Sequence, residues 1–401
     1  MLLSSIYRPL HYCLVSDVLK ILIRYKKDSA DRLFDWDRHG KEIMKTQKQI
    51  GLAIIGSGRI GTLRAKLAKM HPSVGYIAVS DVNPEAAEKL AKTVGADFWS
   101  VDSNEVMTRP EVNAIDIATP EHEHTKPLLA ALELGFPVLV EKPIALLESD
   151  ADLVLKRAQQ LNSDLHIGYS RRYKNRYLIA KEQIVQGRLG TITGACARLY
   201  NSRSQCFAML KRNKGATPVV DALTYYVDLM GWLMANNPVT EVFAKGQKGI
   251  IHAAGYDTED VTWAILTCKD GAVVNLGVSY ALPEKWPSVG HSARVELLGT
   301  HGTLLINDDH TDQIMQTELG FPHVYLSDHK IETVFLESST PGDWALGDFL
   351  GPIADETRAW LDYVSTGKPC NLAKPEDARR TLAVTLAIEE SARTGKTIYL
   401  K

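Results

Sequence analysis

Hydrophobic positions in the first half of the chain follow two alternating patterns. Short apolar runs with the composition of buried strands occur at residues 50–55, 76–80, 113–118, 137–140 and 165–169. Segments with apolar residues three and four apart, which predict amphipathic helices, lie between them at 62–70, 84–93, 122–134 and 149–160. Alternating strands and helices predict an α/β domain over residues 48–170, a doubly wound parallel sheet with helices on both faces.

The pattern changes after about residue 170, where strand-like segments follow one another closely. Alternating apolar positions predict strands at 191–200, 239–247, 261–268, 272–280, 293–298 and 303–307. Hairpin connections are expected at 269–271 and 299–302, and late helices at 355–364 and 375–391. We therefore expect residues 171–401 to form an α+β domain with an open, largely antiparallel sheet.

The most informative motif is a glycine-rich turn after the first predicted strand. Gly56, Gly58 and Gly61 lie between that strand and the next helix. In a dinucleotide-binding turn, the first glycine permits the tight turn, the second lets the backbone approach the pyrophosphate, and the third allows close packing. The second strand is followed by Asp81, where a carboxylate can bind the ribose 2′-OH and repel a 2′-phosphate. An ordinary glycine-rich loop is the alternative; the context favours a Rossmann domain that binds NAD rather than NADP.

Composition narrows the class of protein. The chain has 401 residues, of which 45% are hydrophobic and 23% charged, and a formal net charge of −2. These values are typical of a soluble globular protein without a general attraction to nucleic acid or membranes. The five cysteines are scattered without CxxC spacing, as expected for reduced thiols in a cytoplasmic protein. No apolar stretch approaches the roughly 18 residues that span a bilayer.

The first 47 residues differ from the rest of the chain. Residues 16–25 could form a short amphipathic helix, but Asp17 interrupts the apolar run, and no basic segment or cleavage site indicates a signal peptide. Met44 lies a few residues before the first strand, where a Rossmann domain commonly begins. We therefore expect residues 1–47 to be an extension outside the fold, with Met44 as a candidate start of the protein.

Two further segments carry candidate chemistry. Lys142 follows a buried strand, at the edge of the sheet where ligands bind. In a later predicted helix, Asp221, Tyr225 and Asp228 are spaced four and three apart, which places them on one face. By spacing alone, a solvated lysine and an ordinary polar helix face are the more common explanations.

Six motifs occur in order along residues 48–401: the glycine turn, Asp81, Ala118-Thr119-Pro120 with His124, Glu141-Lys142-Pro143, the segment from Gly168 to Tyr173, and the helix that begins at Asp221. This set resembles the Gfo/Idh/MocA family, the glucose–fructose oxidoreductase and inositol dehydrogenase group. The resemblance implies a Rossmann domain, an open-faced sheet that often mediates oligomerisation, tightly held NAD or NADP, and hydride transfer at a carbinol carbon.

The resemblance also implies roles for individual residues. It places Lys142 beside the nicotinamide and the substrate hydroxyl. Together with the glycine turn, it predicts a cofactor-binding set of Gly56, Gly58, Arg59, Ile60, Gly61, Asp81, Thr119, Pro120, His124, Glu141 and Arg172. The predicted substrate-binding residues are Lys142, Tyr169, Arg171, Arg203, Asp221 and Tyr225. Lys142 and Tyr225 are the predicted catalytic pair.

One position departs from the family pattern. The second-domain helix usually has histidine four residues after the aspartate, and this chain has Tyr225. Because a phenol ionises at about pH 10 and an imidazole near neutrality, the usual acid/base partner is missing. We expect Lys142 to accept the proton, since partial desolvation and a nearby positive nicotinamide favour its neutral amine, with Tyr225 as a helper. The alternatives are a Tyr225 that only hydrogen-bonds substrate, and a different chemistry.

Basic residues are concentrated in one stretch. Between Ser170 and Lys214, eleven lysines and arginines accompany a single acid, Glu182. The stretch predicts a positive funnel that holds a carboxylate, or else a solvated rim. It favours an anionic substrate, such as the carboxylated cis-dihydrodiols that some members of the wider family oxidise. Residues 121–124 alternate Glu and His without an evident distant partner, so we predict no metal site.

The leading prediction is an NAD-dependent dehydrogenase that forms a homo-oligomer through its C-terminal sheet. It would transfer a hydride between nicotinamide and a secondary alcohol of a cyclic or polyhydroxylated substrate, whether sugar, sugar acid, inositol or carboxylated cis-dihydrodiol. One alternative is a non-catalytic NAD-sensing regulator, suggested by the missing histidine. Another uses bound NAD for elimination or glycosidic cleavage, without net formation of NADH. Neither a nucleic-acid nor a membrane partner is expected.

Overall fold

The structure is a computed structural model that describes residues 48–235, 237–284, 291–308, 313–322, 330–337, 343–345 and 348–400. The predicted extension of residues 1–47, with Met44, lies outside the described residues. From Gln49 onward, the described residues form one compact unit.

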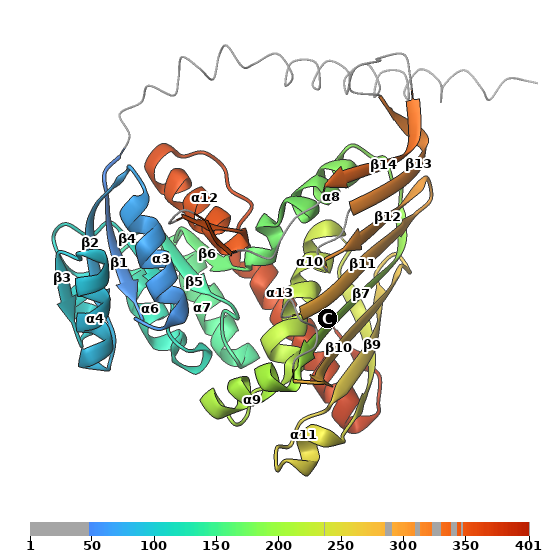
Figure 1. The fold of residues 1–401 in the computed structure, drawn as a ribbon, viewed down its shortest axis with the longest axis horizontal. Helices are drawn as coiled ribbons and strands as arrows, with labels where there is room; N and C mark the ends of the chain where they lie inside the picture. The colour runs from blue at the N-terminus through green and yellow to red at the C-terminus, as the bar shows by residue number, and fades with distance from the viewer. Residues whose placement is uncertain are drawn as a thin grey trace, which may run out of the picture. The chain divides into compact units, whose positions relative to one another are not determined.

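Six parallel strands form the first sheet, in the order β3-β2-β1-β4-β5-β6 (Figure 1). The strands are β1 (Ile50–Ile55), β2 (Val74–Ser80), β3 (Phe98–Ser100), β4 (Ala114–Ile117), β5 (Val138–Glu141) and β6 (Leu165–Gly168). The helices between them are α3 (Arg59–Met70), α4 (Pro84–Val94), α5 (Ser103–Met107), α6 (Thr125–Glu133) and α7 (Glu148–Leu161). Every residue of β1, β4 and β6 is buried, as in a parallel sheet covered on both faces. The predicted doubly wound α/β sheet is confirmed.

Among the described residues, the second sheet has nine strands in the order β14-β13-β12-β11-β7-β10-β9-β8-β17. They are β7 (Ile192–Ser202), β8 (Val239–Gln247), β9 (Val261–Cys268), β10 (Val273–Leu282), β11 (His291–Gly299), β12 (Gly302–Asn307), β13 (Gln313–Pro322), β14 (Lys330–Glu337) and β17 (Ile398–Tyr399). Neighbouring strands are antiparallel except β7 and β10, which pair in parallel. The predicted largely antiparallel sheet is confirmed, as are its hairpins between β9 and β10 and between β11 and β12.

The remaining elements are mostly short helices. They are η1 (Glu121–Glu123), η2 (Ser170–Tyr173), α8 (Asn175–Val185), α9 (Arg203–Arg212), η3 (Val219–Leu223), α10 (Thr224–Leu233), α11 (Ile250–Ala253), α12 (Pro352–Thr366) and α13 (Pro375–Thr394), with a small hairpin of β15 (Asp343–Ala345) and β16 (Asp348–Leu350). No helix among the described residues is both long and apolar enough to cross a bilayer.

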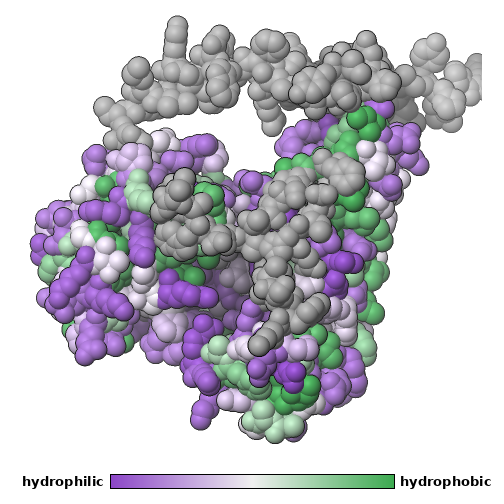
Figure 2. All heavy atoms as spheres, in the orientation of Figure 1, coloured by the Kyte–Doolittle hydropathy of each residue, from purple (hydrophilic) through white to green (hydrophobic). Residues whose placement is uncertain are grey.

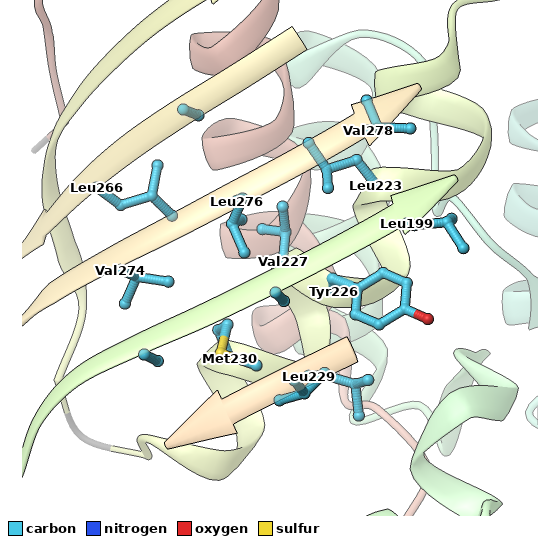
Figure 3. Close-up of a cluster of buried hydrophobic side chains, with 14 of the residues drawn as sticks. Leu199, Leu223, Tyr226, Val227, Leu229, Met230, Leu266, Val274, Leu276 and Val278 are labelled. Carbon is cyan, nitrogen blue, oxygen red and sulfur yellow. The ribbon is translucent and has the colours of Figure 1, made fainter. Parts of the chain in front are cut away.

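Helix α10 is held against the second sheet by a cluster of buried apolar side chains. Figure 3 shows side chains of α10 facing those of β7, β9 and β10, with the following residues labelled: Leu199, Leu223, Tyr226, Val227, Leu229, Met230, Leu266, Val274, Leu276 and Val278. Each of them is at most 5% exposed. Because α10 is apolar around most of its circumference, it is buried on nearly every side. This packing fixes the backbone of Tyr225, which follows the first residue of the helix.

The C-terminal helices return to the first sheet. Trp360 and Leu361 of α12 are fully buried in the same cluster as Ile54 of β1 and Leu139 of β5. Leu382 of α13 belongs to the cluster on the other face of that sheet. The backbone N–H of Ile167 in β6 donates to the carbonyl of Ala373, 3.0 Å away. Helices α12 and α13 therefore complete the hydrophobic core around the first sheet.

Candidate functional site

The glycine turn forms a cradle at the carboxyl end of β1. Gly56 has a φ of 106°, and an added Cβ would lie 2.7 Å from the backbone of Ala118. A Cβ on Gly61 would lie 1.9 Å from the carbonyl oxygen of Gly56. At Gly58, in contrast, nothing lies within 4 Å of the added Cβ. Two glycines are therefore required by packing, whereas the third leaves open space beside the backbone, as a dinucleotide-binding turn requires.

The helix that follows the turn offers an anion site. Helix α3 begins at Arg59 with Gly58 as its N-cap, no side-chain capping bond and no acidic residue in its first turn. Its first N–H groups and the helix dipole favour a pyrophosphate there. Asp81 lies next to the turn, since its two carboxylate oxygens accept hydrogen bonds from the N–H groups of Ser57 (2.8 Å) and Asn83 (2.9 Å). Ile60 is half-buried and Arg59 exposed.

The loop after β4 contains a buried neutral histidine. His124 is 1% exposed, and its Nδ1 lies 2.9 Å from Oγ1 of Thr119. Burial lowers the pKa of His124 to about 4, so the imidazole is neutral at physiological pH. Pro120 precedes the short turn η1. Among the described residues, Nε2 of His124 has no hydrogen-bond partner. The loop thus presents a neutral histidine at the sheet edge where the cofactor is expected.

Lys142 and Tyr225 lie close together, although Lys142 follows β5 of the first sheet and Tyr225 belongs to α10, which packs against the second sheet. The Nζ of Lys142 donates to the carbonyl of Asp221 at 2.7 Å and lies 4.7 Å from the centroid of the Tyr225 ring. Asp221 belongs to η3, a π-helical turn directly before α10. A π turn shifts the register of backbone hydrogen bonds, and such turns are frequent at functional sites. The turn places the Asp221 carbonyl where it orients the lysine amine.

Tyr225 lies among polar and aromatic neighbours. The guanidinium carbon of Arg171 lies 5.6 Å from its ring centroid, and the ring of Tyr169 meets it edge-on at 6.1 Å. Burial, with the negative charge of Glu141 as a second cause, raises the pKa of Tyr225 far above its ordinary value. The phenol is therefore neutral across the physiological range. It can donate a hydrogen bond but cannot serve as a base.

Asp221 has a second partner that the sequence did not indicate. The hydroxyl of Tyr280, in β10, donates to Oδ2 of Asp221 at 2.7 Å. Because this bond occupies one carboxylate oxygen, it restricts the rotamer of the aspartate. Arg203, another predicted substrate residue, begins α9, and its Nε donates to the carbonyl of Leu282 at 3.2 Å.

Three cations surround the carboxylate of Asp308, and one of them, Arg171, also lies over the ring of Tyr225. Asp308 is 3% exposed and accepts from Nζ of Lys174 at 2.6 and 2.7 Å, with Arg176 at 3.1 Å and Arg171 at 3.7 Å. Burial, together with the charge of Arg171, lowers the pKa of Lys174 to about 7. Positive charge therefore exceeds negative charge in this cluster, and Arg171 connects it to the ring of Tyr225.

The eleven basic residues between 170 and 214 lie on several different elements. Several have separate local partners: Arg172 with Asp228, Lys181 with the carbonyl of Trp232, Arg198 with Ser292, and Arg203 with the carbonyl of Leu282. Arg171 is the member that contacts the Tyr225 ring in the described structure. Because several of these side chains are engaged by local partners on different elements, a positive funnel around the site, or else a solvated rim, stays a prediction.

Two predicted cofactor residues are engaged in ion pairs. Arg172 is 3% exposed and binds Asp228 with both Nε (2.8 Å) and Nη2 (2.6 Å). This bidentate pair joins η2 to α10, and the predicted cofactor contact of Arg172 stays a prediction. Glu141 bonds to Nε and Nη2 of Arg64, and its side chain is 14% exposed. A small part of Glu141 therefore remains available to a ligand.

Sequence reasoning missed four residues that support the site: Tyr280, Arg64, Asp116 and Glu356. Arg64 and Glu356 come from helices α3 and α12, and no local pattern indicates that they meet 292 positions apart. Asp116 did carry a signal, since it is an acid inside an otherwise apolar buried strand. A charged residue in such a strand indicates a buried partner.

Two family models match the chain, one over each of its two predicted domains. A family model described as "Oxidoreductase family, NAD-binding Rossmann fold" matches residues 50–169, and the "GFO/IDH/MocA C-terminal domain" matches residues 177–305. The chain is 26% identical over 274 residues to scyllo-inositol 2-dehydrogenase (NAD(+)) of Bacillus subtilis, covering 65% of this chain and 74% of that protein.

Two further relatives are informative. The chain is 25% identical over 265 residues to 2,7-anhydro-N-acetylneuraminate hydratase of Mediterraneibacter gnavus, covering 65% of this chain and 68% of that protein. The solved structure of scyllo-inositol dehydrogenase from Lactobacillus casei, with bound NAD(H) and scyllo-inositol, has a TM-score of 0.69 at 19% identity and covers 88% of this chain and 99% of that one. The chain belongs to the Gfo/Idh/MocA family of oxidoreductases, with an NAD-binding Rossmann fold.

Proposed function

We propose that the chain oxidises a secondary alcohol of a cyclic or polyhydroxylated substrate that also carries a carboxylate. Relatives named inositol 2-dehydrogenases support the ring alcohol. Bound NAD would supply the hydride acceptor, held by the cradle at Gly56, Gly58 and Gly61 and by Asp81. The observation that carries the proposal is the meeting of Lys142 and Tyr225 at the carboxyl end of β5.

Lys142 accepts the hydroxyl proton in this proposal. Its amine donates to the carbonyl of Asp221, which orients Nζ. The proton of the alcohol passes to Nζ as the carbinol C–H bond breaks and the C=O bond forms. Tyr225, whose phenol stays neutral, donates a hydrogen bond to the substrate oxygen, and the free carboxylate oxygen of Asp221 accepts from a neighbouring hydroxyl.

Arg171 binds the carboxylate of the substrate. Its side chain is 18% exposed, it lies over the ring of Tyr225, and its other neighbours, Lys174 and Arg176, are also cations. Asp308 neutralises one of these three charges. A planar guanidinium with surplus positive charge behind it favours bidentate binding of a carboxylate.

The proposal is tested with purified protein, NAD and a panel of inositols, sugars, sugar acids and carboxylated cis-dihydrodiols, by following NADH absorbance. Loss of the base in Lys142→Met should lower kcat about 10²–10⁴-fold. Lys89→Met, which removes a lysine from an exposed position of α4, serves as the matched control. Wild-type kcat in Lys142→Met, or cofactor binding without turnover on any alcohol, would refute the proposal; the second result would identify an NAD-sensing regulator.

A second candidate reaction uses the same site. Because one relative is named a hydratase of an anhydrosugar acid, a cycle in which NAD is reduced and then reoxidised within one turnover is the alternative. It predicts product formation without net NADH accumulation. Chromatographic analysis of the same panel, at substoichiometric NAD, separates the two: oxidation stops when NAD is consumed, and elimination continues.

We also propose that the outer face of the second sheet joins copies of the chain. Large apolar side chains on alternating strand positions are exposed there, namely Phe243, Trp263, Ile265, Val273 and Leu305. Figure 2 shows hydrophobic side chains along the right-hand margin, where Figure 1 places strands of this sheet. Sedimentation equilibrium should show an oligomer that Ile265→Lys weakens and Leu153→Lys, at an exposed position of α7, does not. A monomeric wild-type chain would refute this arrangement.

A further inference from the structure

Three carboxylates share one arginine beneath the site. Arg64 of α3 donates to Glu141 of β5 and, at 2.8 Å, to Oε2 of Glu356 in α12, and its Nε lies 3.7 Å from Oδ2 of Asp116 in β4. Arg64 and Glu356 are fully buried and Asp116 is 1% exposed. We call these four residues the acid cluster.

The acid cluster has too few positive charges for its carboxylates. With all groups ionised, three negative charges would face one positive charge in a buried site, which is costly. Burial raises the pKa of Asp116 to about 7 and that of Glu356 to about 8, although Arg64 opposes both shifts. Neither oxygen of Asp116, nor Oε1 of Glu356, accepts a hydrogen bond from any described residue. The cluster therefore holds a proton near neutral pH.

The acid cluster reaches the cofactor site through Glu141. This residue immediately precedes Lys142, is the most exposed member, and ends β5. In a doubly wound sheet, the dinucleotide crosses the carboxyl ends of the central strands, here β1, β4 and β5. The titratable and charged groups that face the cluster from neighbouring elements are Lys142, His124 after η1, Tyr173 of η2 and Tyr225 of α10.

We propose that the acid cluster is a proton store coupled to the charge of the nicotinamide. The oxidised ring carries a positive charge and the reduced ring does not. Binding of NAD⁺ therefore favours the ionised cluster, and one carboxyl releases its proton to solvent. Binding of NADH leaves that proton in place. Because both cofactors carry the same pyrophosphate, any difference between them arises at the nicotinamide end. The coupling depends on NAD binding and not on the identity of the substrate.

The direct test counts the protons released on binding. Calorimetric titration of the apoprotein with NAD⁺ and with NADH, in buffers of different ionisation enthalpy, gives the number for each. At about pH 7, NAD⁺ should release about 0.3–0.7 proton more than NADH. The Kd of NAD⁺ should fall about three- to tenfold between about pH 6 and about pH 9, while that of NADH changes less over that range.

Isosteric variants identify which carboxyl groups release the protons. Glu356→Gln and Asp116→Asn remove one titrating group each and bring the buried charge closer to balance, and each should reduce the NAD⁺-specific proton release to less than half. Asp355→Asn, at the half-buried neighbour of Glu356 on the same helix, should not change it. Two variants are used so that one folding failure does not remove the test. The proposal is overturned by equal release for NAD⁺ and NADH, by unchanged release in both variants, or by failure to bind NAD⁺. Absence of turnover would refute the proposed function and leave these proton counts unaffected.

Discussion

The acid cluster makes a prediction about stability that requires no ligand. In the unfolded chain, Glu356 ionises at its ordinary pKa of 4.5, whereas in the folded protein burial raises the pKa to about 8. The folded state therefore holds a proton that the unfolded state has lost. This contribution to stability is fully present below about pH 4 and is lost as the pH rises to about 8. Asp116, whose pKa burial raises to about 7, acts in the same direction.

The size of the effect follows from linkage. Each group can remove at most about 1.4 kcal/mol of folding free energy per pH unit over the interval in which the two states differ in protonation. For one group whose pKa is raised by about 3 pH units, the upper bound is about 4 kcal/mol. Because Asp116 and Glu356 share Arg64, their titrations are coupled and the two losses do not add, and we expect a total loss of about 2–3 kcal/mol, below the bound for a single group. Glu356→Gln cannot ionise, so it should be about 2 kcal/mol more stable than the wild type at about pH 9 and nearly equal to it at about pH 5.

The measurement is thermal unfolding of the apoprotein at a series of pH values. At about pH 9, Glu356→Gln should melt about 2–3 °C above the wild type, given the usual unfolding entropy per residue for a chain of this length. Asp355→Asn is the control, since its carboxyl is only half-buried on the next position of α12. Parallel stability curves for the wild type and Glu356→Gln, or a variant that is less stable at alkaline pH, would show that the cluster does not retain a proton in the folded state.

Three further predictions concern the site. Gly58→Ala should leave the free energy of unfolding unchanged within about 1 kcal/mol but weaken NAD binding at least about tenfold. Gly61→Ala, whose Cβ meets the Gly56 carbonyl, should destabilise the fold by about 1–3 kcal/mol or more; calorimetric titration measures the binding of each variant and thermal melting its stability. Tyr225→Phe should lower kcat/KM about 10–100-fold without adding a pH dependence between about pH 6 and about pH 9, because the phenol stays neutral there; a new ionisation in its rate profile would contradict this. Arg171→Met should lower kcat/KM for a carboxylated substrate far more than for its methyl ester, and equal losses for both would refute a carboxylate contact.

Much of the fold follows from local patterns. Strands β8 and β9 have the bounds that alternation predicts, since one face of each strand is buried and the other is open. The glycine turn was predicted because its requirements are local: each glycine acts on backbone within a few residues or on the adjacent strand. The three-residue strand β3 and the five-residue helix α5 escaped prediction, because elements this short show no measurable period.

The polar contacts could not be predicted in the same way. Asp308 meets Lys174 across 134 positions, and Arg64 meets Glu356 across 292, so neither pairing leaves a trace in local spacing. The segment around Asp221 looked like ordinary α-helix, and the π turn that shifts its register has no periodic signature. Arg172 lies in a motif associated with cofactor binding, yet its partner is Asp228. Which of several carboxylates an arginine binds is decided by the tertiary structure.

The return of α12 and α13 to the first sheet has a consequence for biosynthesis. The nucleotide-binding half emerges first from the ribosome, but Trp360, Leu361 and Leu382, which complete its interior, are translated only near the end of the chain. The first sheet therefore cannot complete its hydrophobic core during translation until the second sheet has been synthesised, and the apolar surface that α12 and α13 will cover stays exposed until then. A nascent chain arrested before residue 352 should depend on holdase chaperones, and the full-length polypeptide should release them.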